Sequence, residues 1–205
     1  MTFEFSFDDG HILDLKTATL LENYGFRGMF YITTGWLGQD YKLTADDIRG
    51  LVARGHKIGA HTRQHPMDLK EVNSVDATLE IIGSRADLVD ILGIDVTSFS
   101  YPRGRFDARI KDIVKRGGFT EARTVKVGFT GGEYDPFEKP TTLHMYNRKE
   151  YGGLTWPVYA QDLLAQEPAH FHVWGHSWEL DKNNDWGNFE QLLKILQDIK
   201  LKAFR

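Results

Sequence analysis

Short runs of β-favouring residues alternate along the chain with segments of helical periodicity, and this alternation restricts the fold more than any other feature. Strands are predicted at 3–7, 29–33, 56–60, 96–100, 119–125, 142–145 and 169–175. Helices are predicted between and after them, at 13–24, 44–54, 74–92, 107–116, 157–166 and 189–200. The apolar face of the helix at 74–92 is expected to comprise Val75, Leu79, Ile82, Ala86 and Val89. Strands that alternate with helices form parallel sheets. About seven such units suit a barrel of the TIM type, in which catalytic residues gather on the loops after the strands.

Length and composition indicate one domain, spanning residues 1–205. The 25 basic and 29 acidic residues give a net charge of −4, which argues against nucleic acid as a partner because phosphate binding needs a clustered positive excess. No apolar run reaches the ~20 residues of a membrane-spanning helix, so membrane insertion is not expected. The chain has no cysteine, which excludes disulfides and cysteine-ligated zinc.

The first predicted strand begins almost at Met1, which leaves no room for a signal peptide. As it stands, the sequence is therefore expected to belong to a cytoplasmic protein. Removal of an export leader would leave the same sequence in a secreted one. The oligomeric state is left open.

Two adjacent carboxylates, Asp8 and Asp9, end the first predicted strand, and Gly10 follows at the turn. Adjacent side chains leave a strand end in different directions. One aspartate can therefore hold a metal ion while its neighbour faces whatever that ion activates. Asp-Gly is also a common turn dipeptide, and these residues alone favour a solvated turn. A functional interpretation depends on the motif after the third strand.

His61 and His65 stand four residues apart immediately after the third predicted strand. If this segment forms a helical turn, both imidazoles lie on one face and can chelate one ion. Such a pair alone is more often packing or surface decoration. With an aspartate at an equivalent strand end, it supplies two nitrogens and one oxygen, a set that suits zinc and would also bind cobalt or nickel. The other aspartate could then act as a base on bound water, and these arguments do not decide between Asp8 and Asp9.

The same residues resemble the signature of the polysaccharide deacetylase family, carbohydrate esterase family 4, also known as the NodB-homology domain. The run from Ser6 to Gly10 is similar to the family's T/S-F-D-D-G motif, and the run from His61 to Pro66 matches its H-[S/T]-x-x-H metal motif. Residues 100–104 correspond to R-x-P-Y-G, and residues 173–176 correspond to a strand that ends in histidine. The motifs occur in family order and span residues 6–176.

The resemblance implies a deformed (β/α) barrel of about seven parallel strands and a metal-dependent deacetylase. The implied residues are Asp9, His61 and His65 for the divalent metal ion, Asp8 for the base and His176 for the acid. Metal-bound water, deprotonated by the base, would attack the acyl carbon, and the acid would protonate the leaving group. The implied partner is an acetylated carbohydrate, with N-acetyl groups as in chitin oligomers or peptidoglycan, or O-acetyl groups as in xylan.

Departures from the family pattern lie around the base. Ser100 stands where many members have an arginine that orients the base, and we expect Arg123 to replace it because a guanidinium can pair with a carboxylate. Arg103 replaces the usual tyrosine, which leaves a backbone N–H to stabilise the oxyanion but changes the groove wall. Tyr101, in the same motif, is a further candidate on the substrate side. The family's Asp-Trp motif is not visible, and residues 122–124 occupy its region.

Aromatic residues near His176 are candidates for sugar stacking. Trp178 is the foremost, whereas Trp174 and Trp186 are weaker candidates because aromatic residues more often fill a core. A glycine-containing loop at 131–135 is expected to be mobile and could form a lid.

The remaining polar residues have plainer interpretations. His170 and His172 share one side of the last strand with the predicted acid and are expected to fill the barrel. Glu179 and Asp181 could orient that acid, but ordinary solvated charges are the expected outcome. Glu4 conflicts with a central strand, because a strand that is covered on both faces tolerates charge poorly.

Two other functions fit the same residues less closely. One is hydrolysis of a cyclic amide or ureide, which distant relatives of this fold perform. The other is a non-catalytic carbohydrate-binding relative. The combination of metal ligands with a base and an acid argues against binding alone, which needs neither proton-transfer group.

Overall fold

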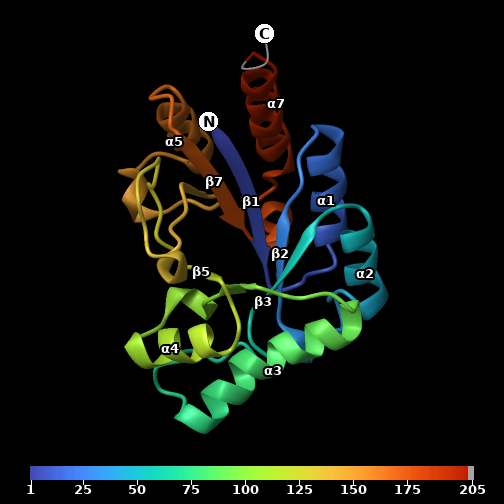
Figure 1. The fold of residues 1–205 in the computed structure, drawn as a ribbon. Helices are drawn as coiled ribbons and strands as arrows, with labels where there is room; N and C mark the ends of the chain where they lie inside the picture. Colours follow the sequence, from blue (N-terminus) through green and yellow to red (C-terminus); the bar gives the residue numbers. More distant parts are fainter. Residues whose placement is uncertain (203–205) are drawn as a thin grey trace.

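The computed structural model describes residues 1–202 and contains one curled sheet of seven parallel strands with helices around it (Figure 1). The strands pair in the order β5-β4-β3-β2-β1-β7-β6. Their bounds are β1 Thr2–Asp8, β2 Met29–Ile32, β3 Lys57–Ala60, β4 Ser98–Ser100, β5 Glu121–Arg123, β6 Leu143–His144 and β7 His170–Gly175. The prediction of a deformed barrel of about seven parallel strands is confirmed.

The segment that leads into β6 spans the gap between the two ends of the sheet. At its start, the N–H of Lys139 donates to the carbonyl of Ala122 in β5, at 2.9 Å. Further along, the N–H of Thr142 donates to the carbonyl of His172 in β7, also at 2.9 Å. One stretch of chain is thus bonded first to β5 and then to β7, which brings the ends of the sheet toward each other.

Helices and short 3-10 turns connect the strands. The helices are α1 Asp14–Asn23, α2 Ala45–Ala53, α3 Ser74–Leu92, α4 Ala108–Arg116, α5 Trp156–Leu164, α6 Ser177–Lys182 and α7 Trp186–Lys202, and the 3-10 turns are η1 Thr34–Trp36, η2 Pro102–Gly104, η3 Pro136–Glu138 and η4 Lys149–Tyr151. Only α6 was not predicted, because its six residues are too few to show an apolar repeat. Within residues 1–202, no helix is both long and apolar enough to cross a membrane.

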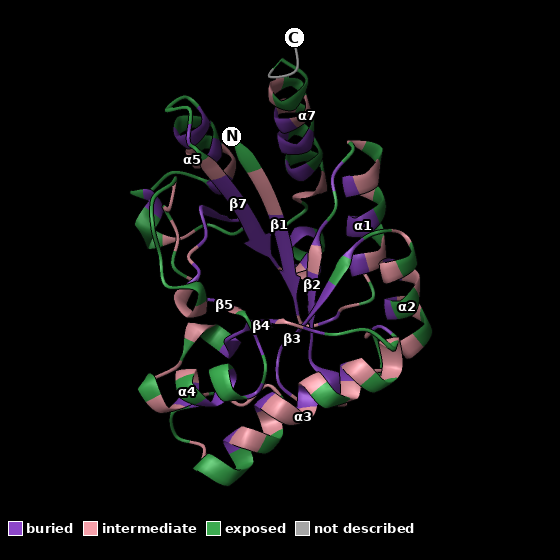
Figure 2. Cartoon of the chain, in the orientation of Figure 1, coloured by how far each residue is buried: buried purple, intermediate pink, exposed green. Residues whose placement is uncertain are grey.

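The two faces of β1 differ in chemistry. Phe5 and Phe7 pack outward, with their rings 5.0 Å from Phe26 and 6.0 Å from Phe189. The alternate residues face the inside of the curl, where polar groups of distant strands meet. Glu4 is accommodated there because the ammonium of Lys139 lies 2.8 Å from its carboxylate. The apolar core therefore lies between the sheet and its helices, and the strands are largely buried (Figure 2).

The structure corrects two details of the sequence prediction. In α3 the expected apolar face is wrong: Val75 is 70% exposed and Leu79 54% exposed, whereas Ala77, Ile81, Ser84 and Leu88 are buried. The suggestion that the loop at 131–135 forms a lid over the site is also wrong. The carbonyl of Thr130 accepts the N–H of His170 at the start of β7, so this loop lies at the end of the barrel opposite His176.

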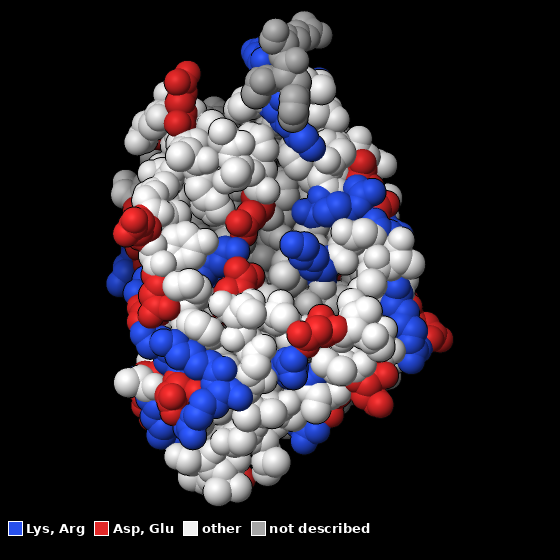
Figure 3. Space-filling model, in the orientation of Figure 1, with Lys and Arg blue, Asp and Glu red and all other residues white. Residues whose placement is uncertain are grey.

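The surface carries both signs of charge. On the face drawn in Figure 3, basic and acidic side chains are interspersed rather than separated into two fields. This mixture agrees with the small net charge of −4.

Candidate active site

The aspartate pair lies at the carboxyl end of β1, where the chain turns sharply. Asp9 and Gly10 both have left-handed backbones, with φ of 79° and 58°. Aspartate tolerates this region better than most residues do, and glycine adopts it without cost. The turn directs the two carboxylates differently, so that Asp8 faces the inside of the curl and Asp9 faces the loop after β3.

His61 follows β3 directly, and the carbonyl of Ser100 fixes its ring. Its Nδ1 lies 2.8 Å from that carbonyl oxygen, so Nδ1–H donates and Nε2 is left to act as a ligand. The segment between the two histidines does not form a helical turn. Thr62 and His65 have φ of 66° and 51°, and the hydroxyl of Thr62 accepts the N–H of His65 at 3.0 Å. This irregular loop still places the two imidazole rings 4.9 Å apart.

Helix α3 holds the histidine loop through two carboxylates. Glu80 accepts the backbone N–H groups of Arg63 and Gln64, at 2.9 and 2.8 Å. Asp87 accepts two hydrogen bonds from the guanidinium of Arg63, at 2.8 and 2.6 Å. Gly83 lies beneath that guanidinium, and a Cβ there would come within 2.6 Å of its central carbon. A side chain at this position would therefore displace the guanidinium from its place against Asp87, which accounts for a glycine inside this helix although glycine lowers helix stability by about 1 kcal/mol.

Asp9, His61 and His65 form a set of donors that fits a divalent metal ion. Asp9 Oδ1 lies 3.7 Å from Nε2 of each histidine. This oxygen is buried and has no hydrogen-bond partner among residues 1–202, as expected for an atom that binds a metal ion. Burial, assisted by the charge of His61, lowers the pKa of His65 to about 4, so its ring is neutral at pH 7 and available to bind a cation.

Asp8 is buried against Arg123, which comes from β5 on the far side of the curl. Their side chains form an ion pair, and Arg123 also donates to the hydroxyl of Ser100 at 2.6 Å. Asp8 is 3% exposed and Arg123 is fully buried. Burial alone would raise the pKa of Asp8, but the charge of Arg123, with smaller contributions from His61 and His176, lowers it. Ser100 and Arg123 are register partners on β4 and β5, so the small serine leaves room for the guanidinium.

His176 follows β7 and is held by Glu179. Nδ1 of His176 lies 2.8 Å from Glu179 Oε2, and the same oxygen lies 3.0 Å from His144 Nε2. Burial opposes protonation of His176, but the hydrogen bond and charge of Glu179, with those of both aspartates, raise its pKa to about 9. Nε2 of His176 points back to Asp9, 3.8 Å from Oδ2. The expectation that Glu179 is a solvated charge is therefore wrong.

Sequence reasoning considered Glu179 as a group that orients His176 but did not favour that role, and it missed His144 altogether. Glu179 stands three residues after His176, the spacing of a capping box, and its carboxylate accepts the backbone N–H of His176 at 3.1 Å. The three-residue spacing was the sequence signal that pointed to Glu179. No sequence signal pointed to His144, because β6 brings it to the site and its ring stacks on Trp174, with ring centroids 3.9 Å apart.

The other predicted site residues occupy different surroundings. The side chain of Tyr101 is fully buried, its ring stacks on Phe106 at 4.1 Å, and its hydroxyl donates to the carbonyl of Phe137. The prediction that this side chain lies on the substrate side of the site is therefore wrong. Arg103 is exposed in a left-handed turn with φ of 57°. Trp178 is partly exposed beside His176, with ring centroids 5.4 Å apart, and remains a candidate stacking wall.

The weaker candidates have structural roles. Trp174 is buried, and the guanidinium of Arg123 lies 4.5 Å from its ring centroid. Trp186 donates from its indole N–H to Asp181, at 3.0 Å. These contacts account for both tryptophans and for Asp181 without a substrate.

Comparison with known proteins identifies related families and folds. A family model described as "Polysaccharide deacetylase" matches residues 2–122. The Streptococcus pyogenes deacetylase PplD, solved with acetate, is 25% identical over 61% of this chain and 56% of its own, with a TM-score of 0.57. A family 4 carbohydrate esterase from Streptomyces lividans, also solved with acetate, is 14% identical over 95% of this chain and 88% of its own, with a TM-score of 0.67.

BA3943 from Bacillus anthracis, described as a CE4 family pseudoenzyme, is 13% identical over 98% of this chain and 60% of its own, with a TM-score of 0.66. The chain spans about half the length of PplD and of a Bacillus cereus polysaccharide deacetylase, with shares of 56% and 45%. No curated protein matches the chain. A pseudoenzyme among the similar structures means that the fold alone does not decide activity.

Proposed function

This chain belongs to the polysaccharide deacetylase family, and from that membership we propose that it is a metal-dependent deacetylase that removes N-acetyl or O-acetyl groups from a carbohydrate. The observation that supports this most is the convergence of a complete set of groups at one end of the barrel. The set comprises metal ligands from the ends of β1 and β3, a buried carboxylate paired with arginine, and a histidine paired with glutamate.

Asp9, His61 and His65 would hold the ion, and the family is generally metal-dependent. Zinc is our proposal for its identity because two imidazoles and one carboxylate suit it, and cobalt or nickel would suit the same set. When bound, the ion would supply Lewis-acid chemistry, which polarises the acyl carbonyl and makes water more acidic.

Asp8 would act as the base. Its lowered pKa keeps it ionised at neutral pH. Arg123 holds one of its oxygens, and the other, Oδ1, is buried with no partner in the described part of the chain. That oxygen is free to accept a proton from the attacking water. The backbone N–H of Arg103 is the proposed oxyanion donor, a contribution that is typically worth 10²–10³ in rate, or about 3–4 kcal/mol.

His176 would act as the acid. Glu179 fixes its ring through Nδ1, so the proton on Nε2 is directed toward the aspartate pair. Its raised pKa of about 9 keeps that proton in place at neutral pH. The leaving amine or alkoxide of the sugar would take this proton as the bond to the acyl carbon breaks.

Loss of an acetyl group, followed by mass spectrometry, tests the proposal. Chitin oligomers, peptidoglycan fragments and acetylated xylan are incubated with zinc-loaded protein, with chelated protein and with a zinc-loaded Asp8→Asn variant. We expect acetate release from the zinc-loaded protein, none from the chelated protein, and release that is at least ~10²-fold slower from the variant, although the variant still binds zinc. No acetyl loss from any of these substrates would refute the proposal, and zinc-dependent opening of a cyclic imide would favour the alternative hydrolase.

A further inference from the structure

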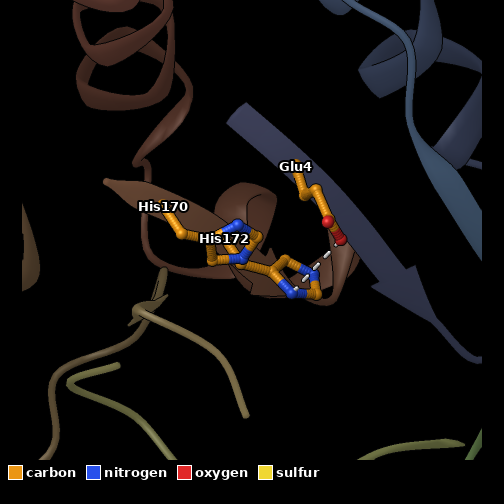
Figure 4. Close-up of side chains that lie close together, drawn as sticks. All are labelled: Glu4, His170 and His172. Atoms are coloured by element: carbon orange, nitrogen blue, oxygen red, sulfur yellow. Dashed lines mark ion pairs between the residues drawn. The ribbon is translucent and has the colours of Figure 1, made fainter. Parts of the chain in front are cut away.

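A second cluster of potential ligands lies at the opposite end of β1 and β7. Glu4 of β1 and His172 of β7 are register partners, and His170 precedes His172 on the same face. Figure 4 shows the three side chains pointing toward one another from these neighbouring strands. Each offers one ligand atom, and these atoms lie within 4.8 Å of one another. Nδ1 of His172 is 3.8 Å from Oε2 of Glu4.

Hydroxyl groups on β1 hold the other nitrogen of each ring. Nε2 of His172 lies 2.8 Å from the hydroxyl of Ser6, and Nδ1 of His170 lies 3.0 Å from the hydroxyl of Thr2. Hydrogen bonds of this kind to the far nitrogen fix ring orientation in metal sites. They leave Nδ1 of His172 facing Glu4 and Nε2 of His170 available as a ligand.

The inward nitrogen of His172 makes no hydrogen bond of normal geometry. The residue is 2% exposed, and no group within residues 1–202 meets hydrogen-bonding geometry at its Nδ1, although the backbone carbonyl of Pro140 lies near the ring. A buried polar atom without a partner costs about 1–3 kcal/mol. A polar atom in such surroundings is suited to bind a water molecule or an ion, and the neighbouring carboxylate and imidazole supply the remaining ligands of a cation.

We propose that Glu4, His170 and His172 form a second metal site, for a divalent ion such as Zn²⁺ or Co²⁺, distinct from the site at Asp9. Two imidazoles and one carboxylate are the donor types that these ions prefer. Five residues of strand separate Glu4 from Asp9, which corresponds to ~16 Å along β1. The two ions would therefore occupy opposite ends of the barrel and share no ligand.

Lys139 sets the strength of this site. Its ammonium lies 2.8 Å from Glu4 and 3.0 Å from Glu121, so these three groups together carry one net negative charge. An incoming cation competes with the ammonium for Glu4, while Glu121 can retain the lysine. The side chain of Glu4 is 38% exposed, and Glu4, Glu121 and Lys139 line a cavity of about 310 Å³, so the carboxylate of Glu4 is accessible to an ion from solvent.

The ligands must also contract around the ion. At a tetrahedral angle, bonds of ~2.1 Å place two ligand atoms ~3.4 Å apart, so the 3.8 Å between Glu4 and His172 has to shorten by less than about half an ångström. The ligand atoms of the three residues lie within 4.8 Å of one another, so His170, at the partly exposed start of β7, has to move inward by at most ~1.4 Å. A bound ion would then join β1 to β7 at the end of the barrel where the chain begins.

Titration of the whole chain with Co²⁺, followed by visible absorption and calorimetry, tests the proposal. We expect two ions per wild-type chain and one in an Asp9→Asn variant, which removes a ligand of the first site. In that background, Glu4→Gln should weaken the remaining site by at least ~10-fold, and Lys139→Met should tighten it by removing the competing cation. Glu71→Gln, the same substitution at an exposed position, should change nothing.

Two results would overturn the proposal. One is a single ion per wild-type chain that Asp9→Asn abolishes. The other is a second ion whose affinity is the same with and without Glu4→Gln. Because Glu4 is partly exposed, its substitution leaves the core intact, and circular dichroism confirms folding before titration.

Discussion

Removal of the guanidinium of Arg123 should lower both the stability and the activity of the protein. In an Arg123→Met variant, the apolar side chain can occupy the space beside Trp174, but the buried carboxylate of Asp8 loses its partner. Two unit charges 4 Å apart interact by about 4 kcal/mol at an effective dielectric constant of 20. Breaking a buried pair by removal of one partner costs about 3–5 kcal/mol. We therefore expect the free energy of unfolding to fall by that amount.

A double-mutant cycle separates the ion pair from general damage. Urea denaturation is measured in chelator for the wild type, Arg123→Met, Asp8→Asn and the double variant. Because the double variant contains neither buried charge, it should be more stable than the sum of the single losses predicts, by about 3 kcal/mol. The matched control is the exposed pair of Arg116 and Asp112 on α4, where coupling should be about 0.3–0.5 kcal/mol.

The catalytic consequence follows from the same contact. Without Arg123, the base is no longer held in place, and we expect kcat of the zinc-loaded Arg123→Met variant to fall by ~10²-fold or more, with a smaller change in KM. Single-variant losses that simply add in the double variant would refute the reasoning, because they would show that the two buried charges do not stabilise each other.

The remaining predictions concern groups around the site. Glu80→Gln removes the charge that accepts the N–H groups of Arg63 and Gln64, so zinc affinity measured by competition with a chelating dye should fall by ~10–100-fold, and an unchanged affinity would show that α3 does not hold the histidine loop. Glu179→Gln weakens the hold on His176, so kcat should fall while KM stays constant, by less than the ~10²–10⁴-fold that general acid catalysis contributes; a loss confined to KM would contradict this role. Burial raises the pKa of Asp14 from 3.8 to about 8, so between about pH 4 and pH 8 the unfolded chain releases a proton that the folded protein keeps. This group should therefore make the free energy of unfolding of the metal-free wild type fall as pH rises through that window, by up to about 1.4 kcal/mol per unit, and urea denaturation at several pH values should show a smaller fall in Asp14→Asn, most clearly between about pH 4 and pH 6.

The fold was largely predictable because the local signals in this chain agree with its tertiary structure. The helices predicted to start at Thr44 and Asp107 begin there, with these two residues as the N-caps of α2 and α4, and the bounds of α3 match the prediction. The face of α3 was not predictable from its apolar residues, because they occur on more than one side. Its rotation follows from Glu80, Gly83 and Asp87, which must face the histidine loop.

The site was predictable where the residues lie at strand ends and unpredictable where they meet through space. Asp9, His61 and His65 come together as the motifs indicated, although a left-handed loop rather than a helical turn joins the two histidines. His144 reaches Glu179 only because β6 pairs with β7, and residues 35 positions apart carry no local pattern that relates them. The catalytic roles of these residues remain predictions.

The register of β4 and β5 restricts how the position of this arginine can change during evolution. Ser100 and Arg123 face each other across the two strands, and the space beside Asp8 holds one guanidinium. Moving the arginine to the position where many family members carry it requires two substitutions. Either order passes through an intermediate with two buried cations or with none. The two arrangements are thus alternative solutions separated by an unstable step, and among relatives a large residue at one position should accompany a small residue at the other.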